Sequence, residues 1–142
     1  MRKTLITLII SAGVVASAVP VIAHHAFAAE FDANKRLQLE GTVTKMEWIN
    51  PHAWMHIDVK KPDGTSEEWM IEGGTPNTLL RRGITRDSLK PGTVVRVDGY
   101  QAKDGSKRAN GRDLTLQNGQ KLFMGSSGTG APVDGADASE KK

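Results

Sequence analysis

Alternating apolar and polar positions predict a succession of short β-strands. From Leu37 to Thr44 the side chains alternate with a period of two, which is typical of a strand with one buried face. The alternation changes phase near Lys45 and Met46, which predicts a β-bulge there. Over 52–59, Ala53, Met55, Ile57 and Val59 fall on one face, and His52, Trp54, His56 and Asp58 fall on the other. Further strands are predicted over 67–72, 93–100, 112–116 and 121–124, with Trp69, Ile71, Val95 and Val97 on buried faces.

Turn signals separate these segments, and one helix interrupts them. Asp-Gly and Asn-Gly pairs favour type I′ turns, because both central residues of such a turn need a positive φ. The predicted turns are Pro62-Asp63-Gly64, Asp104-Gly105, Asn110-Gly111 and Asn118-Gly119, with another at Pro91-Gly92. The helix is predicted over 77–82, where Thr75 is the N-cap, Pro76 lies in the first turn and Gly83 is the terminator.

This order of elements predicts an all-β fold with one short helix, namely an OB-fold-like small barrel of five strands. Three strands, a helix and then two or more strands match that fold, and an open sheet or a sandwich of the same strands is the alternative. The barrel domain is predicted over 35–124. Residues 125–142 are rich in Gly, Ser, Ala and Asp, and we expect a disordered tail there because hardly any large apolar side chain is available for burial.

The start of the chain has the pattern of a secretory signal peptide. Arg2 and Lys3 precede an apolar run, which gives way to small residues and predicts a leader over 1–23 with cleavage after Ala23. Cleavage after Ala18 or Ala28 also fits, and a retained membrane anchor is the alternative because the apolar stretch is near spanning length. Residues 24–34 then form an N-terminal segment that carries a histidine pair.

Composition narrows the possible classes of function. The 142 residues include no Cys, which excludes a disulfide scaffold, a Cys-based zinc site, a Cys nucleophile and a lipoprotein anchor. Removal of Arg2 and Lys3 with the leader lowers the net charge from +3 to +1. The basic residues are interleaved with acids, so we interpret them as a solvated surface. Together with export, this predicts no nucleic-acid partner and membrane contact only during export.

The four histidines fall in two places, at His24-His25 and at His52 and His56. A mature chain that starts at His24 offers an α-amine and two imidazoles, a donor set that suits square-planar Cu(II) or Ni(II) and also zinc. Four residues of strand span roughly 13 Å, so His52 and His56 cannot share an ion on a regular strand. A shared site needs a bulge, or an N-terminus that folds over one of the two. The alternative is that His24-His25 is a disordered start without a role and that His52 and His56 are polar residues of the surface or the rim.

A tryptophan-rich segment over 47–54 is the second candidate site. Trp48, Asn50, Pro51 and Trp54 predict a ligand or partner face on the barrel. The alternative is that the two tryptophans cover the barrel while Asn50-Pro51 makes a corner. The sequence has no Gly-x-Ser-x-Gly, phosphate-binding loop or metalloprotease helix motif, so it predicts no enzyme and no catalytic residue.

Several motifs resemble one family. His-His-Ala-Phe-Ala-Ala-Glu-Phe-Asp at 24–32, Gly-Thr-Val at 41–43 and Glu-Trp-x-Asn-Pro-His-Ala-Trp at 47–54 are similar to a domain-of-unknown-function family of small exported proteins of Gram-negative bacteria. Segments 81–83, 88–92 and 108–110 also match its pattern. The resemblance implies a periplasmic location and a single small barrel, and it supplies no activity and no catalytic residues.

Two hypotheses of different classes follow. The first is a periplasmic binding module of unknown ligand, in which copper, zinc or another divalent metal is bound through His24, His25, His52 and His56. The second is a structural or interaction protein of the cell envelope that uses the Trp-rich barrel face without a metal. The expected partner is correspondingly an unknown envelope protein or a small ligand.

Overall fold

Six strands and two short helices follow one another along residues 26–125, the part of the chain that this computed structural model describes. The predicted leader, His24, His25 and most of the predicted tail lie outside these residues. The elements are α2 (Ala26–Glu30), β1 (Phe31–Glu47), β2 (Trp54–Lys60), β3 (Ser66–Glu72), α3 (Pro76–Arg81), β4 (Val94–Ala102), β5 (Arg108–Leu116) and β6 (Lys121–Phe123).

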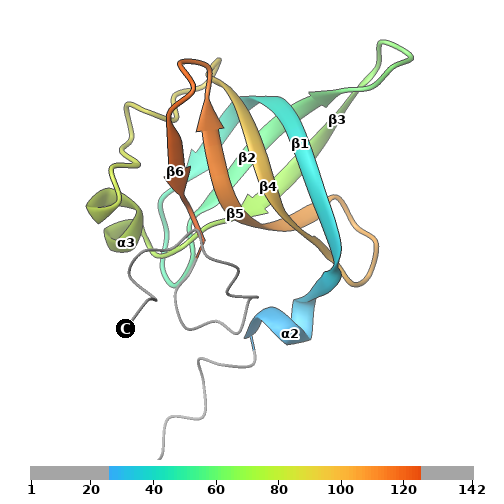
Figure 1. The fold of residues 1–142 in the computed structure, drawn as a ribbon, viewed down its shortest axis with the longest axis horizontal. Helices are drawn as coiled ribbons and strands as arrows, with labels where there is room; N and C mark the ends of the chain where they lie inside the picture. Colours follow the sequence, from blue (N-terminus) through green and yellow to red (C-terminus); the bar gives the residue numbers. More distant parts are fainter. Residues whose placement is uncertain (1–25, 126–142) are drawn as a thin grey trace, which may run out of the picture.

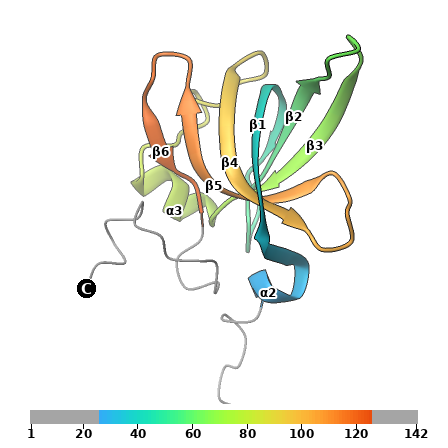
Figure 2. The ribbon, with the colours of Figure 1, turned by 45° about the vertical axis from the view of Figure 1, so that its right-hand side comes forward.

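Five of these strands close into a ring. The sheet order is β3-β2-β1-β4-β5-β6, and a short parallel pairing of β3 with β5 joins the ends of the ring. Figures 1 and 2 show the strands curving around one core, with α2 below one end of the barrel and α3 beside it. Since α3 connects β3 to β4, the connectivity is that of an OB-fold. The predicted fold class is therefore confirmed, and the open sheet and the sandwich are excluded.

The long strand β1 serves both halves of the ring. It pairs with β4 along Arg36 to Thr42 and with β2 along Thr42 to Glu47, and its register shifts between Val43 and Lys45. A bulge bends a strand and increases its twist, which lets one strand pass from one partner to the next. The predicted bulge is confirmed, whereas the strand itself begins earlier than the alternation of side chains indicates.

The barrel interior holds the apolar faces that the alternation predicts. Ala53, Met55, Ile57, Ile71, Val95 and Val97 are at most 1% exposed, and Trp69 is 6% exposed. The helix prediction is confirmed as well: the Thr78 N–H donates to the Thr75 hydroxyl oxygen over 3.2 Å, and Gly83 has a φ of 83°. The fully buried Leu79 anchors α3 against this core.

Asn110-Gly111 is not a turn, so that prediction is wrong. Both residues lie inside β5, and the residues of the described chain with positive φ do not include Gly111. A Cβ at Gly111 would come within 2.7 Å of both the Ile71 Cγ2 and the Met124 Sδ. Glycine is required there because core side chains approach the backbone closely, and not because the backbone needs a left-handed conformation.

Helix α2 belongs to a second, smaller apolar cluster, and the sequence analysis did not predict it. Phe27 and Phe31 pack with Tyr100 and Ala102, and Trp54 packs against this group. The Phe27 and Tyr100 rings meet edge to face with centroids 5.3 Å apart. This cluster fixes the segment that follows His25 against one end of the barrel. Among the described residues, no helix is long and apolar enough to cross a membrane.

Candidate functional site

Strand register brings four side chains into a row at the α2 end of the barrel. Trp54 of β2 is the register partner of Glu72 at the end of β3, and Glu72 is the partner of Asn110 on β5. Asn110 is in turn the partner of Tyr100 on β4. Because Ile71 next to Glu72 is buried in the core, Glu72 points away from the barrel interior. The row therefore lies on the outer wall, where α2 packs.

A buried carboxyl and a histidine meet in this row. The His52 Nδ1 lies 3.1 Å from the Glu72 Oε1, and the Asn110 side-chain amide donates to the same oxygen over 3.3 Å. Glu72 is only 6% exposed and Asn110 only 3%. His52 reaches them from the loop between β1 and β2, in which the Asn50-Pro51 peptide bond is cis. Within residues 26–125, the other ring nitrogen of His52 has no hydrogen-bond partner.

Burial favours the neutral form of both side chains in this pair. Burial raises the pKa of Glu72 to about 7, and the negative charge of Glu30 adds to the rise, while Asn110 and Arg108 oppose it. Burial also lowers the pKa of His52, against the opposing effect of Glu30. Removing a charge from water is costly, so a buried acid holds its proton and a buried imidazole loses one. Both shifts favour the uncharged forms of the two side chains.

Arg108 and Glu30 border the pair. The Arg108 Nη2 lies 3.0 Å from the Glu30 Oε2, and the guanidinium carbon lies 5.0 Å from the centre of the Trp54 ring. The Lys103 side chain and backbone N–H also donate to the Ala28 and Glu30 carbonyl oxygens of α2. The interpretation of these basic residues as a solvated surface is therefore incomplete, because they hold α2 against the barrel.

His56 is held quite differently. Its Nδ1 lies 2.7 Å from the Glu68 Oε1 and its Nε2 lies 3.0 Å from the Glu47 Oε1, so the ring links β1, β2 and β3. Both contacts can be hydrogen-bond donations at once only in the doubly protonated ring. Glu68 and Glu72 are four residues apart in β3, which separates them by roughly 13 Å. The structure therefore keeps His52 and His56 apart, and this agrees with the prediction from strand geometry.

The Trp-rich segment is divided between two apolar clusters. Trp48 packs against the main core with the Arg86 guanidinium 5.3 Å from its ring centre, while Trp54 packs against the α2 cluster. Asn50 and Pro51 are exposed in the loop between them. The two tryptophans thus each cover a part of the barrel, and Asn50-Pro51 makes the corner that joins them.

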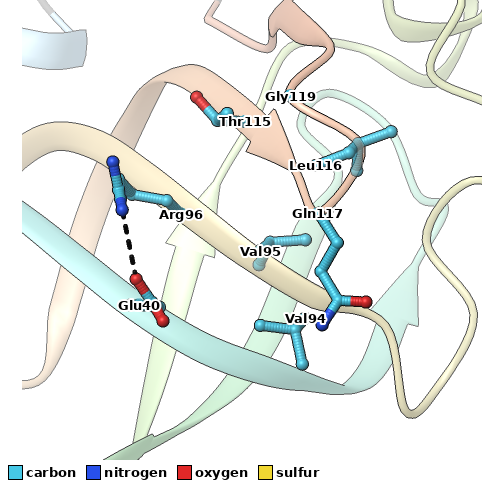
Figure 3. A pocket seen from close by; sticks show the side chains of 8 residues that line it. All are labelled: Glu40, Val94, Val95, Arg96, Thr115, Leu116, Gln117 and Gly119. Atoms are coloured by element: carbon cyan, nitrogen blue, oxygen red, sulfur yellow. Dashed lines mark hydrogen bonds and ion pairs between the residues drawn. The ribbon is translucent and has the colours of Figure 1, made fainter.

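The most spacious cavity among those described lies at the other end of β4 and β5. It has a volume of about 350 Å³ and is lined by Glu40, Val94, Val95, Arg96, Thr115, Leu116, Gln117 and Gly119. Figure 3 shows Glu40 and Arg96 pointing toward each other from neighbouring strands, and they form an ion pair at 3.4 Å. The lining has no histidine, and its two charged side chains neutralise each other. We therefore place the candidate site at the α2 end.

Sequence reasoning found His52 and missed its partners. Glu72 is the last residue of a predicted strand, and nothing in the local pattern singled it out. Asn110 was hidden because Asn-Gly is also the strongest short hairpin signal. Across residues 26–125, no three His, Asp or Glu side chains converge as a ready-made metal site. A metal at His52 and Glu72 needs further ligands.

Comparisons with known proteins give the family and leave the activity open. The family model described as a family of unknown function, DUF6152, matches residues 12–111, which is well over half of the chain. No curated protein matches the sequence. One similar solved structure is the mitochondrial single-stranded DNA-binding protein Rim1 from S. cerevisiae, with 15% identity, a TM-score of 0.44 and coverage of 58% of this chain and 94% of that chain.

This structural match corrects one prediction. The sequence analysis excluded a nucleic-acid partner, and the protein matched here is described as binding single-stranded DNA, so the exclusion is withdrawn. The exclusion rested on the interleaved charges and on export, and export is itself a prediction. The correction goes no further, because a fold similarity at this identity does not identify the ligand of this chain.

Proposed function

The chain belongs to the DUF6152 family of unknown function, and we propose that it is an exported binding module that holds a divalent transition metal beside His52 and Glu72. The observation that carries the proposal is the buried contact of 3.1 Å between the His52 Nδ1 and the Glu72 Oε1. Zinc and copper bind nitrogen and oxygen donors at about 2.0–2.2 Å, so two neighbouring ligands on one ion lie roughly 3 Å apart. The pair already has that spacing.

The donor types favour particular ions. Imidazole nitrogen and carboxylate oxygen suit Cu(II) and Zn(II), whereas Cu(I) prefers the sulfur of Cys and Met. The chain has no Cys. Metal binding would require the deprotonated Glu72 carboxylate. The bound cation would then compensate the negative charge that burial disfavours there.

His24 and His25 complete the proposed ligand set. Both lie outside the described residues, and in the sequence His25 directly precedes Ala26, the first residue of α2. Cleavage after Ala23 would add the α-amine of His24 as a further donor. Periplasmic location and a binding rather than catalytic role are parts of this proposal.

Metal titration of the exported protein tests it. The full chain is produced with its leader in a Gram-negative host, the intact mass establishes the mature N-terminus, and the affinities for Cu(II) and Zn(II) are measured by competition with a chelator. We expect His52→Ala, and separately the double variant His24→Ala/His25→Ala, to weaken binding by about tenfold or more, as loss of ligands usually does. His56→Gln is the matched control and should change the affinity by less than about twofold.

A wild-type protein that binds Cu(II) and Zn(II) no more tightly than His52→Ala would rule out the proposal. The interaction hypothesis would then gain weight. Its supporting observation is Ile49, a large apolar side chain that is 50% exposed and follows Trp48 in the chain. A complex that forms equally well in chelator and is lost in Ile49→Ser would favour that alternative.

A further inference from the structure

We infer that the outer wall of β1, β4, β5 and β6 is a binding surface for a neutral oligosaccharide. None of its residues belongs to the His52–Glu72 site, and the inference does not depend on the proposed metal. Strand register aligns its side chains in two rows, each with one member from every strand. The first row is Gln38, Asp98, Asp113 and Phe123, and the second is Glu40, Arg96, Thr115 and Lys121. These residues are the two-row surface.

The alternation of each strand turns the two-row surface outward. The neighbouring Val95, Val97 and Leu114 are at most 1% exposed, and Leu39 and Leu122 pack against the same core. Because successive side chains of a strand point to opposite faces, the two rows point away from this core. The rows lie roughly 6.6 Å apart along the strands, and four neighbouring strands span roughly 14 Å. The surface is thus wide enough for several linked sugar rings.

Two cavities hollow the two-row surface and share Thr115. One has a volume of about 350 Å³ and is lined by Glu40 and Arg96 among others, and the second has a volume of about 320 Å³ and is lined by Asp113 and Phe123 among others. Figure 3 shows Glu40, Arg96 and Thr115 on three neighbouring strands along the first cavity. Both volumes fall in the range of ligand pockets, about 300–1,000 Å³. Two adjoining cavities suit a ligand of linked units.

The surface offers hydrogen-bonding groups of both kinds. Within residues 26–125, the Thr115 hydroxyl and the Lys121 ammonium have no hydrogen-bond or ion-pair partner. The Asp98 Oδ1 accepts from the Gln38 side-chain amide over 2.7 Å, and a carboxylate has lone pairs for further donors. Sugar hydroxyls both donate and accept, so they match this mixture of carboxylates, hydroxyl and ammonium.

The charge pattern disfavours charged ligands. Glu40 and Arg96 neutralise each other in an ion pair at 3.4 Å. Asp98 and Asp113 are register partners on neighbouring strands, so a nucleic acid would bring its phosphates next to two carboxylates. A polycation would meet Lys121 beside the same two acids. A ligand without charge avoids both repulsions.

Backbone pairing disfavours a peptide. A peptide that adds as a strand needs a free sheet edge, whereas β4 lies between β1 and β5, and β5 lies between β4 and β6. A ligand on this face is therefore bound by side chains. Phe123 gives the first row a half-buried ring, against which the C–H face of a sugar packs. The Arg82 guanidinium lies 4.4 Å from the centre of this ring, and Phe123 still lines the second cavity.

Titration of the full exported protein with three neutral tetrasaccharides tests the inference. The ligands are maltotetraose, cellotetraose and the tetramer of N-acetylglucosamine, each added up to about 10 mM in the presence of a chelator. Amide chemical shifts of the isotope-labelled protein report where they bind. We expect at least one of them to shift the Thr115 and Lys121 amides most, with little dependence on salt, because a neutral ligand is not screened. It should bind about tenfold more tightly than its monosaccharide, which fills one cavity only.

Matched variants locate the site. Asp113→Asn keeps the side-chain shape and removes the charge that accepts from sugar hydroxyls, so we expect binding to weaken by about tenfold. Phe123→Leu removes the ring and should weaken binding by about fivefold. Asp58→Asn is the matched control, because Asp58 is also half-buried but lies on β2, and it should change the affinity by less than about twofold. The shift map of the wild type needs no variant, so the test holds even where a variant folds poorly.

Several outcomes would overturn the inference. The wild type could show no amide shifts with any of the three sugars, or shifts confined to other strands. Asp113→Asn could bind the sugar as tightly as the wild type. Two further ligands cover the other classes, namely a tetra-alanine peptide and a single-stranded oligothymidylate. If either binds the two-row surface and the sugars do not, that class of ligand replaces the oligosaccharide.

Discussion

The two histidines of the β2 region stand in opposite environments. His56 contacts a carboxylate with each ring nitrogen, and both acids, Glu47 and Glu68, are partly exposed to water. His52 contacts a single carboxyl, that of Glu72, which is buried and shares its oxygen with Asn110. His56 is thus saturated by the protein, whereas His52 keeps a ring nitrogen without a partner among the described residues.

The two histidines differ in whether a ring nitrogen is left for a further contact. A histidine with both nitrogens bound to acids acts as a cross-link between strands, and an incoming ion would have to break two good contacts. Hydrogen bonds from Lys45 and then His56 lower the pKa of Glu47, so this cross-link favours charged acids. At His52, burial disfavours charge on both partners, so the contact with Glu72 favours the neutral forms. Three predictions test this contrast.

The largest effect should come from Phe27→Ala, which removes the aromatic contact between α2 and Tyr100. We expect α2 to undock with a loss of roughly 3 kcal/mol in local stability, the usual order for truncation of a buried Phe. Hydrogen exchange measures it at the Lys103 amide, which donates to the Glu30 carbonyl oxygen over 2.9 Å. Exchange around His56 should stay unchanged, and equal slowing or speeding at both places would contradict the separation of the two regions.

The pH dependence of stability should distinguish the regions next. The Glu72 pKa is about 7 in the folded protein against an ordinary value of 4.5, so between these values the folded state holds more protons than the unfolded state. The free energy of unfolding therefore falls as pH rises from about 4.5 to about 7 and then levels off. The pKa of His52 is lowered, so this side chain reduces the free energy of unfolding as pH falls below its ordinary value of 6.5.

Glu72→Gln should remove the fall in the free energy of unfolding that occurs in the wild type as pH rises. Relative to wild type, we expect this variant to gain on the order of 2 kcal/mol at about pH 8 and little at about pH 5. Thermal unfolding at a series of pH values measures the difference, and Glu68→Gln serves as the control without a buried carboxyl. Parallel stability curves for wild type and Glu72→Gln across this range would show that Glu72 is not the buried acid that the structure indicates.

The smallest effect is expected at the saturated histidine. A double-mutant cycle of His56→Gln and Glu68→Gln should give a coupling free energy of about 0.5–1 kcal/mol, which falls in high salt, because Glu68 is largely in water. The Glu68 side chain is 62% exposed. Chemical unfolding in low and high salt measures the coupling. A coupling several times larger and insensitive to salt would place His56 in the same buried class as His52.

The strands, the helix α3 and most of the core could be predicted from local patterns. Period-two alternation located the buried faces, for example Met55 and Ile57 on β2. Turn chemistry located the glycines that need a positive φ, such as Gly64 and Gly119, but the predicted type I′ geometry is wrong, because in the described chain no residue other than glycine has a positive φ. These features depend on a few neighbouring residues, so a single sequence contains enough information to find them.

One local pattern, the Asn110-Gly111 pair, led to a wrong turn prediction. Asn110-Gly111 has the signature of a hairpin turn, yet it lies in β5, where Gly111 clears space for core side chains and Asn110 supports Glu72. The same dipeptide suits a turn and a crowded strand, because glycine supplies both a permissive backbone and the absence of a Cβ. The choice between them depends on residues far away in the chain.

By itself the sequence determined the order of elements, the buried faces and the presence of His52 and His56 on neighbouring stretches of the chain. Only the tertiary structure decided that these histidines differ. The β3–β5 pairing brings Glu72 next to Asn110, and the docking of α2 brings Glu30 and Arg108 beside them. Those contacts join residues about 40 to 80 positions apart, and closure of a barrel is a property of the whole ring rather than of any segment.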